Sequence, residues 1–362
     1  MRRFALLALL VIVLFSVIAP AALAQAGSPV QVAAEQYFAG GTKNIKAADL
    51  FANLNDGDAA NDPMRIDIRK AEDYANGHIP GAINMPGTSI FTAENLAKLP
   101  KDKQIVLNCY SGQTASQSVS ALRMMGYDAY NLLYGVPSWG TNDKVTYPFK
   151  AEQSGNYPYS KDATQLDGNF AAPKPLGETV EGAALAYFAG GFKTTKAADL
   201  FANLNDGDDS NNPVILDVRK PEDYAAGHIP GAVNVAVKDL FTTAMLAKLP
   251  ADKQIVAYCY SGQTASQATS ALRMLGYDAY NMQFGMPAWA IIDETSTPVW
   301  NVSKSLNQPL VLGSEPIAAA APAADAAAAP APAALPTTGA PLFSLILAGL
   351  GLTGAGLALR KR

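Results

Sequence analysis

The sequence contains little cysteine and little histidine, and no cluster of basic residues lies in the part expected to fold. Only two cysteines, Cys109 and Cys259, occur among 362 residues. A secreted scaffold held together by several disulfides needs more, so a single structural disulfide is the only such alternative left. The formal net charge is −4. We therefore expect no nucleic acid as a partner, because polyanion binding depends on clustered lysine and arginine.

The N-terminus carries an apolar run with the pattern of an export signal. Two arginines precede an apolar stretch over residues 4–18, and small residues follow up to Ala24. This order is typical of a secretory signal peptide, here residues 1–24, which is removed on export. An uncleaved N-terminal membrane helix is the alternative, and it implies export as well.

The C-terminus carries a second apolar run in a more specific setting. The motif Leu-Pro-Thr-Thr-Gly at residues 335–339 precedes apolar residues 341–359 and three terminal basic residues. At ~1.5 Å per residue, that run is about long enough for one transmembrane segment. Together the three parts, residues 335–362, resemble the sorting signal that sortases recognise. The resemblance implies cleavage between Thr338 and Gly339 and attachment to the cell wall. A plain transmembrane anchor is the alternative, so the partner for anchoring is a sortase or the membrane. The Ala- and Pro-rich residues 316–336 cannot pack a core and are predicted to form a stalk.

Between these ends one sequence unit occurs twice. Residues 37–140 align without gaps to residues 187–290, and 70 of the 104 positions are identical. An offset of 150 residues relates Cys109 to Cys259. Equivalent cysteines occupy equivalent local sites, which disfavours a disulfide between them. One cysteine and one histidine per repeat cannot form a structural zinc site, which needs four ligands, so we expect no metal and no cofactor.

Each repeat alternates helix and strand patterns. In the first repeat we predict helices over residues 47–54, 93–99 and 113–125, and strands over residues 65–68, 82–84, 104–108 and 129–132. This alternation predicts an α/β fold, a short and mostly parallel sheet covered by helices on both faces. We place the two domains at residues 45–148 and 195–300, joined by a Pro- and Gly-rich linker over residues 149–180.

Each cysteine follows a short apolar strand and precedes a helix. The carboxyl end of a parallel strand is where α/β folds bind ligands. The loop after it, Cys-Tyr-Ser-Gly-Gln-Thr in both repeats, directs backbone N–H groups and a helix N-terminus toward the sulfur. Both features favour an anion, so we expect a stabilised thiolate with a lowered pKa.

Four motifs in the same order occur in both repeats, and together they resemble the rhodanese family. In the first repeat they are Asp67-Ile68-Arg69, the segment Gly-His-Ile-Pro-Gly-Ala at residues 77–82, the cysteine loop, and Gly126-Tyr127 leading to Gly135 and Trp139. The resemblance implies two rhodanese-like α/β domains.

The family resemblance also implies sulfur transfer. A cysteine takes a sulfane sulfur from a small donor such as thiosulfate or polysulfide, becomes a persulfide, and passes the sulfur to a thiol or another nucleophile. Cys109 and Cys259 take the nucleophilic role. The anion cradle is expected to come mainly from loop backbone N–H groups: Tyr110, Ser111, Gly112, Gln113 and Thr114 in the first repeat, Tyr260, Ser261, Gly262, Gln263 and Thr264 in the second.

The loops depart from the family pattern in one respect. Many rhodaneses have an arginine after the cysteine and a basic residue near the loop's end, whereas Tyr110 and Thr114 stand there in the first repeat. A dianion such as thiosulfate loses charge-assisted contacts, which leaves the donor open. Asp67 with Arg69, and Asp217 with Arg219, are interpreted as supporting ion pairs, and the two histidines as turn-stabilising residues.

Two other functions remain open beside an exported sulfurtransferase. A non-catalytic module that binds sulfur species or senses redox state is the main alternative. A rhodanese-fold phosphatase is disfavoured, because that class needs a longer loop closed by arginine, and no arginine occurs between Cys109 and Arg123.

Overall fold

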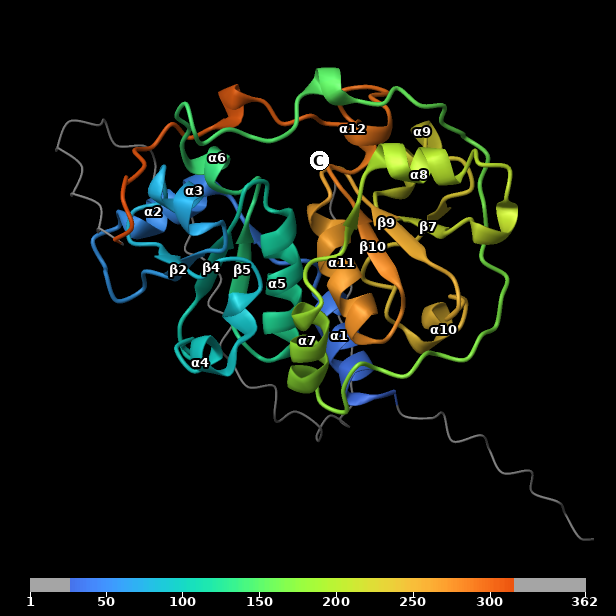
Figure 1. Ribbon diagram of the computed structural model, residues 1–362, viewed down its shortest axis with the longest axis horizontal. Helices are drawn as coiled ribbons and strands as arrows, with labels where there is room; N and C mark the ends of the chain where they lie inside the picture. The colour runs from blue at the N-terminus through green and yellow to red at the C-terminus, as the bar shows by residue number, and fades with distance from the viewer. Residues whose placement is uncertain (1–26, 316–362) are drawn as a thin grey trace, which may run out of the picture. The chain divides into compact units, whose positions relative to one another are not determined.

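The structure, a computed structural model, describes residues 27–315 (Figure 1). The predicted signal peptide, stalk and sorting signal lie outside these residues. No helix within residues 27–315 has both the length and the apolar character needed to cross a membrane.

The two repeats form two five-stranded sheets in which every pairing is parallel. The first sheet has the order β1-β5-β4-β2-β3 and the second β6-β10-β9-β7-β8. The strands of the first sheet are β1 (Asn44–Ile45), β2 (Met64–Asp67), β3 (Ile83–Asn84), β4 (Ile105–Asn108) and β5 (Ala129–Leu132). Those of the second are β6 (Thr194–Thr195), β7 (Val214–Asp217), β8 (Val233–Asn234), β9 (Ile255–Tyr258) and β10 (Ala279–Met282). The predicted α/β class with two parallel sheets is thus confirmed.

The helices repeat in the same way. The first repeat contains α1 (Pro29–Ala39), α2 (Ala47–Leu54), α3 (Ala71–Ala75), α4 (Ala93–Leu96), α5 (Gln113–Met124) and α6 (Val136–Trp139). The second contains α7 (Val180–Ala189), α8 (Ala197–Asn203), α9 (Pro221–Ala226), α10 (Thr243–Leu246), α11 (Gln263–Met274) and α12 (Met286–Trp289). Short 3₁₀ turns are η1 (Ser89–Phe91), η2 (Ala151–Gln153), η3 (Asp209–Asn211) and η4 (Val302–Lys304).

The helix predicted over residues 93–99 is shorter than expected. It begins as predicted, because the Thr92 side chain accepts a hydrogen bond from Asn95 N. The α-helix ends at Leu96, and the chain continues in three-residue turns in which Leu99 N donates to Leu96 O. Such turns tighten a helix end ahead of a proline such as Pro100.

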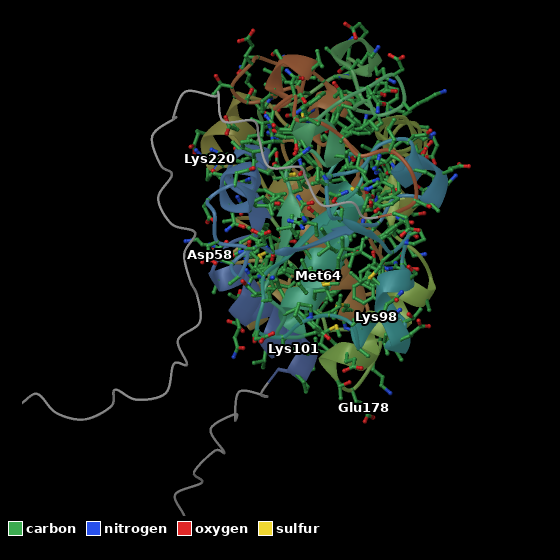
Figure 2. The ribbon with its side chains drawn as sticks, turned by 90° about the vertical axis from the view of Figure 1, so that its left-hand side faces the viewer. Asp58, Met64, Lys98, Lys101, Glu178 and Lys220 are labelled. Atoms are coloured by element: carbon green, nitrogen blue, oxygen red, sulfur yellow. The ribbon has the colours of Figure 1, made fainter. Side chains whose placement is uncertain are left out.

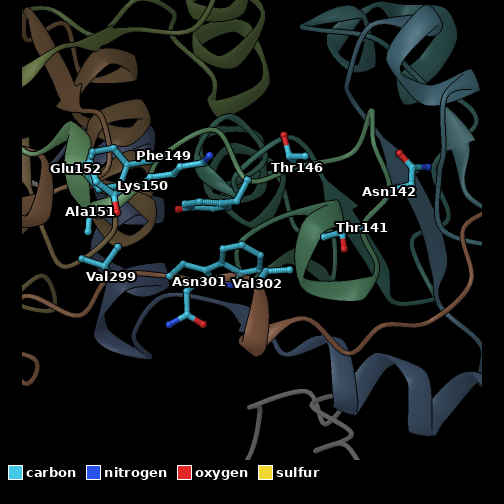
Figure 3. Close-up of a pocket in the computed structure, with 12 residues that line it drawn as sticks. Thr141, Asn142, Thr146, Phe149, Lys150, Ala151, Glu152, Val299, Asn301 and Val302 are labelled. Atoms are coloured by element: carbon cyan, nitrogen blue, oxygen red, sulfur yellow. The ribbon is translucent and has the colours of Figure 1, made fainter.

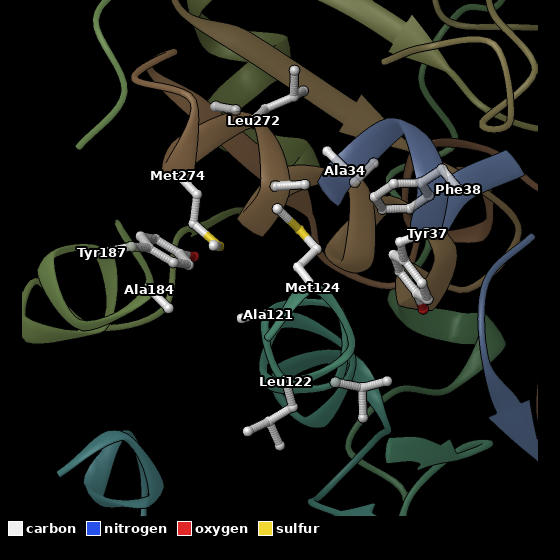
Figure 4. Packing of buried hydrophobic residues seen from close by; sticks show 14 of the residues in the cluster. Ala34, Tyr37, Phe38, Ala121, Leu122, Met124, Ala184, Tyr187, Leu272 and Met274 are labelled. Carbon is white, nitrogen blue, oxygen red and sulfur yellow. The ribbon is translucent and has the colours of Figure 1, made fainter. Parts of the chain in front are cut away.

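The two sheets meet through α5 and α11, which lie side by side between them (Figure 1). Both helices are buried along nearly their whole length, including polar residues such as Gln117 and Ser120. Small residues allow this approach, and the hydroxyls of Ser120 and Ser270 form a hydrogen bond between the helices. Met124, Met274 and neighbouring apolar side chains extend the contact into one core (Figure 4).

The N-terminal helix of each repeat packs on the long helix of its own repeat and also reaches the other repeat, an arrangement the sequence did not reveal. Phe38 of α1 stacks on Phe241 with ring centroids 4.3 Å apart, and Phe188 of α7 stacks on Phe91 at 3.7 Å. The Tyr37 hydroxyl donates to Gln267 Oε1 across the interface. Both helices lie outside the residues 45–148 and 195–300 that we predicted for the domains.

The chain segments that follow each repeat are exchanged as well. Ser160, in the predicted linker, forms an antiparallel bridge with His228 of the second repeat. Val311, after the second repeat, forms the equivalent bridge with His78 of the first. Each tail thus covers the repeat that it does not belong to, and the two repeats share one hydrophobic core.

Charged side chains of both signs cover the surface. Asp58, Lys98, Lys101, Glu178 and Lys220 are all exposed (Figure 2). This interspersed pattern fits the modest net charge of the chain.

Candidate functional site

Cys109 lies where the central strand β4 ends and the loop to α5 begins. Its sulfur accepts a hydrogen bond from Gly112 N at 3.1 Å. In the second repeat, Ala265 N lies 3.5 Å from the sulfur of Cys259. The predicted placement of both thiols before a helix N-terminus is therefore found, as is the approach of backbone N–H groups to the sulfur.

Glycine fixes the shape of each loop. Gly112 has φ +81° and Gly262 has φ +79°, left-handed conformations that side chains rarely adopt. These residues turn the chain from strand to helix so that the loop N–H groups face inward. Neither cysteine forms a disulfide.

Both thiols are buried, at 1% exposure for Cys109 and 2% for Cys259. Burial raises the pKa of the Cys259 thiol, and hydrogen bonds from the loop N–H groups oppose this only in part. The expectation of a lowered pKa is thus wrong for Cys259 in this closed arrangement. The physical reason is desolvation, which disfavours the charged form more than the loop N–H groups favour it.

The first residue of α5 and the first residue of α11 connect the two repeats. Gln263 Oε1 accepts hydrogen bonds from Asn131 Nδ2 and Tyr134 N of the first repeat, each at 3.0 Å. Gln113 Oε1 accepts the equivalent bonds from Asn281 Nδ2 and Phe284 N, also at 3.0 Å. The two cysteine loops are therefore neighbours across the interface.

An aromatic cluster covers this region, and we call it the aromatic cap. Its members come from both repeats and both connecting segments: Tyr134, Tyr147, Phe149, Phe284 and Trp300. The ring of Tyr147 lies 4.7 Å from that of Trp300 and 6.1 Å from those of Tyr134 and Phe284. Burial raises the pKa of Tyr147, and the nearby groups that raise it further include Tyr134 and both cysteines. Tyr147, near the end of the predicted first domain, thus lies within electrostatic reach of both thiols.

A pocket of about 530 Å³ adjoins the aromatic cap (Figure 3). Tyr147, Phe149 and Trp300 line it together with residues of the linker and of the segment around η4. Lys150 and Glu152 are the charged residues in its lining, and neither cysteine belongs to it. The pocket is therefore not lined by either thiol, although it shares Tyr147, Phe149 and Trp300 with the cap.

The side chains of Tyr110 and Tyr260 are directed away from the thiols. The Tyr110 hydroxyl donates to Asp73 Oδ2 at 2.5 Å and accepts from Lys70 N at 3.2 Å. The Tyr260 hydroxyl donates to Asp223 in the same way. These bonds close the loop against the start of α3 and α9 and leave the cradle to backbone N–H groups.

The remaining loop residues have different partners. The hydroxyls of Ser111 and Ser261 accept hydrogen bonds from the amides of Gln113 and Gln263. Thr114 and Thr264 are half-buried. Threonine is neutral, so neither side chain supplies a charge to its loop. No basic side chain stands in either cysteine loop.

The predicted supporting ion pairs are present. Arg69 Nη2 lies 2.7 Å from Asp67 Oδ2, and Arg219 Nη2 lies 2.7 Å from Asp217 Oδ2. Each arginine also donates to the carbonyl of the glycine before the histidine, Gly77 or Gly227. Both pairs are buried and anchor the histidine turn to the sheet.

The histidines stabilise that turn, as predicted. His78 Nδ1 lies 3.0 Å from Tyr74 O, and the His78 ring stacks on that of Tyr74 at 3.7 Å. The backbone of His78 binds the exchanged tail at Val311. The turn is thus also a docking point between the repeats.

Sequence reasoning missed the aromatic cap. Tyr147 and Phe149 stand at the border that we placed between the first domain and the linker, and Trp300 ends the predicted second domain; none of them was predicted to lie near the cysteines. Aromatic residues in a polar, proline-rich segment were a usable clue, because large aromatic side chains gain much free energy when they are buried.

Comparison with known proteins yields several sulfurtransferases. A tRNA sulfurtransferase of Pyrobaculum aerophilum is 43% identical over 70 residues, 19% of this chain and 14% of that protein. The thiosulfate sulfurtransferase GlpE of Pseudoalteromonas translucida is 35% identical over 82 residues, 22% of this chain and 76% of that protein. The HTH-type transcriptional regulator Rv0324 of Mycobacterium tuberculosis is 38% identical over 79 residues, 21% of this chain and 34% of that protein. The chain spans only 14% to 34% of the length of the first and third of these relatives.

Solved structures give matches of the same kind. A thiosulfate sulfurtransferase from Pseudomonas aeruginosa is 22% identical, covers 70% of this chain and 45% of its own, and has a TM-score of 0.26. A rhodanese-like domain protein from Staphylococcus aureus is 26% identical over 28% of this chain and 95% of its own, with a TM-score of 0.25.

The family comparison covers both repeats. The rhodanese-like domain matches residues 46–142 and 197–291, which together are more than half of the chain. The chain therefore belongs to the rhodanese-like family and carries two such domains in tandem.

Proposed function

We propose that this protein is a sulfurtransferase that uses Cys109 and Cys259 as nucleophiles. The observation that carries the proposal is the placement of each thiol at the end of a central parallel strand, with loop N–H groups directed at the sulfur. Names of relatives matched over single domains, a tRNA sulfurtransferase and a thiosulfate sulfurtransferase, support the same reaction class.

The reaction has two displacement steps. The cysteine thiolate attacks the sulfane sulfur of the donor, the donor S–S bond breaks, and the remainder leaves with the electron pair, as sulfite from thiosulfate. The product is an enzyme persulfide. An acceptor thiolate then attacks the outer sulfur, the persulfide S–S bond breaks, and the cysteine thiolate is regenerated. The loop N–H groups stabilise the negative charge of the thiolate and of the persulfide.

The loops favour a donor of low charge. No basic side chain stands in either loop, and Tyr110 and Tyr260 bond to carboxylates outside it. We propose that a polysulfide of low charge, such as an organic polysulfide, is preferred over thiosulfate, because a dianion gains most from charge-assisted hydrogen bonds that these loops do not supply. Tyr110→Arg and Tyr260→Arg should raise kcat/KM for thiosulfate more than for polysulfide, and an unchanged ratio would contradict this.

The central experiment is mass spectrometry of each cysteine peptide after treatment with thiosulfate or polysulfide. Persulfidation adds about 32 Da. Cys109→Ser and Cys259→Ser should each remove part of the sulfur transfer, and the double variant all of it. Full transfer by the double variant would refute the proposal.

A sulfur-binding or redox-sensing module is the second candidate. The burial of both thiols beneath the aromatic cap, with the raised pKa of Cys259, favours it. The two candidates differ in turnover. An enzyme passes many sulfurs per cysteine to an excess of thiol acceptor, whereas a binding module stops after one.

We propose that the protein acts outside the cytoplasm and is held at the cell surface. The N-terminal signal pattern and the C-terminal sorting pattern support this location. If a sortase cleaves after Thr338, a covalent bond to the wall remains, and detergent cannot break it. Muralytic enzymes should then release a chain that ends at Thr338 joined to a wall fragment. Complete detergent extraction of a chain that still ends at Arg362 would instead establish a membrane anchor through residues 341–359.

A further inference from the structure

One glutamine side chain of each repeat belongs to both active-site loops. Gln263 begins in the second loop, and its Nε2 donates to Ser261 Oγ of that loop at 3.0 Å. Its Oε1 crosses the interface and accepts from Asn131 Nδ2 and Tyr134 N. The side chain is buried, so water does not compete for these bonds.

The residues that Gln263 binds lie directly against Cys109. Tyr134 is followed by Gly135, where a side chain would come within 2.2 Å of Cys109 O. Val136 N donates to that same carbonyl oxygen at 3.0 Å. The turn over residues 132–136 is therefore the outer wall of the Cys109 loop, and Gln263 holds this wall from the other repeat.

Gln263 also contacts the Cys109 loop itself. A side chain at Gly112 would lie 2.3 Å from Gln263 Oε1. Gly112 supplies the N–H that reaches the Cys109 sulfur. The glycine at this position thus admits the glutamine of the neighbouring repeat as well as allowing the left-handed turn.

The held turn is strained. Tyr134 has φ +63°, a left-handed conformation that is unfavourable for a bulky residue. The Tyr134 N–H donates the hydrogen bond that Gln263 Oε1 accepts. Without this acceptor the strained turn has less to keep it in place.

The second loop is held in the same way by the first repeat. Gln113 Oε1 accepts from Phe284 N, and Phe284 also has φ +63°. Met286 N donates to Cys259 O at 2.8 Å, and a side chain at Gly262 would lie 2.3 Å from Gln113 Oε1. The duplication therefore builds a reciprocal pair of contacts.

We propose that Gln113 and Gln263 are positioning residues that act across the interface: Gln263 positions the loop of Cys109, and Gln113 positions the loop of Cys259. Neither catalytic site is complete within its own repeat. The effect of the glutamines on sulfur transfer rests on the proposed function, whereas their positioning of the two loops does not.

The test uses the full chain with one cysteine at a time. In the Cys259→Ser background, Gln263 lies in a repeat without a nucleophile, so any effect on Cys109 must cross the interface. We expect Gln263→Ala to lower kcat for transfer through Cys109 about tenfold, which corresponds to about 1.4 kcal/mol. KM for the donor should change less than twofold, because the glutamine holds the loop and does not contact the donor. The same substitution should speed alkylation of Cys109 by iodoacetamide about tenfold, since the loosened turn exposes a buried thiol.

Gln267→Ala is the matched control. Gln267 lies one helical turn further along α11, is buried, and accepts hydrogen bonds across the interface from the Tyr37 hydroxyl and Lys43 N. Within residues 27–315 its side chain forms hydrogen bonds to Tyr37, Lys43 and Asn44 and none to either cysteine loop, so its loss should leave kcat and alkylation of Cys109 within about twofold. Gln263→Glu keeps an oxygen that accepts the same bonds and should restore Cys109 to within about threefold of its parent. In the Cys109→Ser background, Gln113→Ala should act on Cys259, with Gln117→Ala as control.

Equal effects of Gln263→Ala and Gln267→Ala on Cys109 would overturn the proposal, because they would mean general weakening of the interface. A Gln263→Ala protein that does not fold leaves Gln263→Glu and Gln267→Ala to be compared by alkylation. If Gln263→Glu changes the alkylation rate of Cys109 no more than Gln267→Ala does, the proposal is supported. A larger change in Gln263→Glu overturns it. If no variant, nor the parent, forms a persulfide, the proposed function fails while the alkylation rates still report on positioning.

Discussion

The two repeats present the same cysteine loop on different supports. In the second repeat, Tyr258 precedes the cysteine, and its hydroxyl accepts a hydrogen bond from Ile229 N at 3.2 Å. The Arg219 guanidinium lies 5.5 Å from the Tyr258 ring centroid and also donates to Ser296 O at 3.1 Å. In the first repeat Asn108 stands at the position of Tyr258, and within residues 27–315 Arg69 has no counterpart of the bond to Ser296.

This comparison shows where the duplicated sequence has been free to change. The six loop residues are identical, and so are the glutamine contacts between the repeats. The residues beneath the loop differ in size and polarity. Changes there need only fill space and satisfy hydrogen bonds, whereas a change in the loop or its glutamine would disturb both sites at once.

The largest expected difference between the repeats concerns the buried ion pairs. Arg69→Met and Arg219→Met each leave a buried carboxylate without its partner, which typically destabilises a protein by about 3–5 kcal/mol. Arg219→Met should be more harmful by about 1 kcal/mol, because it also removes the bond to Ser296 O. Urea unfolding of the two variants measures the difference.

The exposed pair of Lys98 with Glu94 provides the control. Lys98→Met should reduce the free energy of unfolding by about 1 kcal/mol or less, since exposed pairs contribute little. An Arg69→Met protein less stable than Arg219→Met would show that the extra bond of the second repeat has no net effect.

The aromatic cap offers a way to expose both sites together. Trp300 packs on Tyr147, which lies near both thiols. Trp300→Ala removes one ring of the cap, and we expect iodoacetamide to alkylate Cys109 and Cys259 each about tenfold faster. This factor corresponds to a free energy of opening the cap that is lower by about 1.4 kcal/mol. Peptide mass spectrometry over a time course measures both rates. Acceleration of one thiol alone would mean that the cap is not shared.

The sequence was sufficient for the fold class, the duplication and the position of the cysteine loops. The apolar residues around Cys109 follow the spacing of a strand and then of a helix. Such spacing depends only on neighbouring residues, so it predicts local structure well. The strand over residues 129–132 and the helix over residues 47–54 were predicted with the bounds observed.

The contacts between the repeats could not be predicted in this way. Gln113 was assigned to its own loop, yet its Oε1 binds Phe284 of the other repeat. The contact of α1 with the second repeat and the exchange of the tails join segments far apart in the sequence, such as Val311 and His78, and nothing in the sequence of one repeat records which partner it covers. The same holds for the raised pKa of Cys259, because burial causes it and burial depends on the tertiary structure.

The pH dependence of alkylation tests the effect of burial on Cys259. Burial raises the pKa of Cys259 above its ordinary value of 9.0. In the Cys109→Ser variant, the alkylation rate should therefore still be rising at pH 9, since only the thiolate reacts. Because the folded state favours the neutral thiol, the associated stability is present below the unfolded pKa and is lost as pH rises through the folded pKa. The same titration of Cys109 in the Cys259→Ser variant completes the comparison.

Opening the cap provides the control for this titration. Adding Trp300→Ala to Cys109→Ser should lower the midpoint for Cys259, because water then reaches the thiol. A midpoint at or below pH 9 in the closed protein would contradict the role of burial.

The smallest expected difference comes from one hydroxyl group in the aromatic cap. Tyr134 and Phe284 occupy equivalent positions with the same backbone conformation, φ +63°. Burial raises the pKa of Tyr134, and a charge on Cys259 of the other repeat raises it further. The neutral Tyr134 hydroxyl is thus within electrostatic reach of Cys259, and a phenylalanine stands at its counterpart. Tyr134→Phe removes the hydroxyl dipole and keeps the ring, so we expect transfer through Cys259 to fall about two- to fivefold, which corresponds to about 0.5–1 kcal/mol. Transfer through Cys109 should not change. Phe284→Tyr adds a hydroxyl at the equivalent position and should alter Cys109 alone. Rates measured in the two single-cysteine backgrounds decide the matter: if Tyr134→Phe changes both thiols equally, the hydroxyl acts through the shared cap and not on one site.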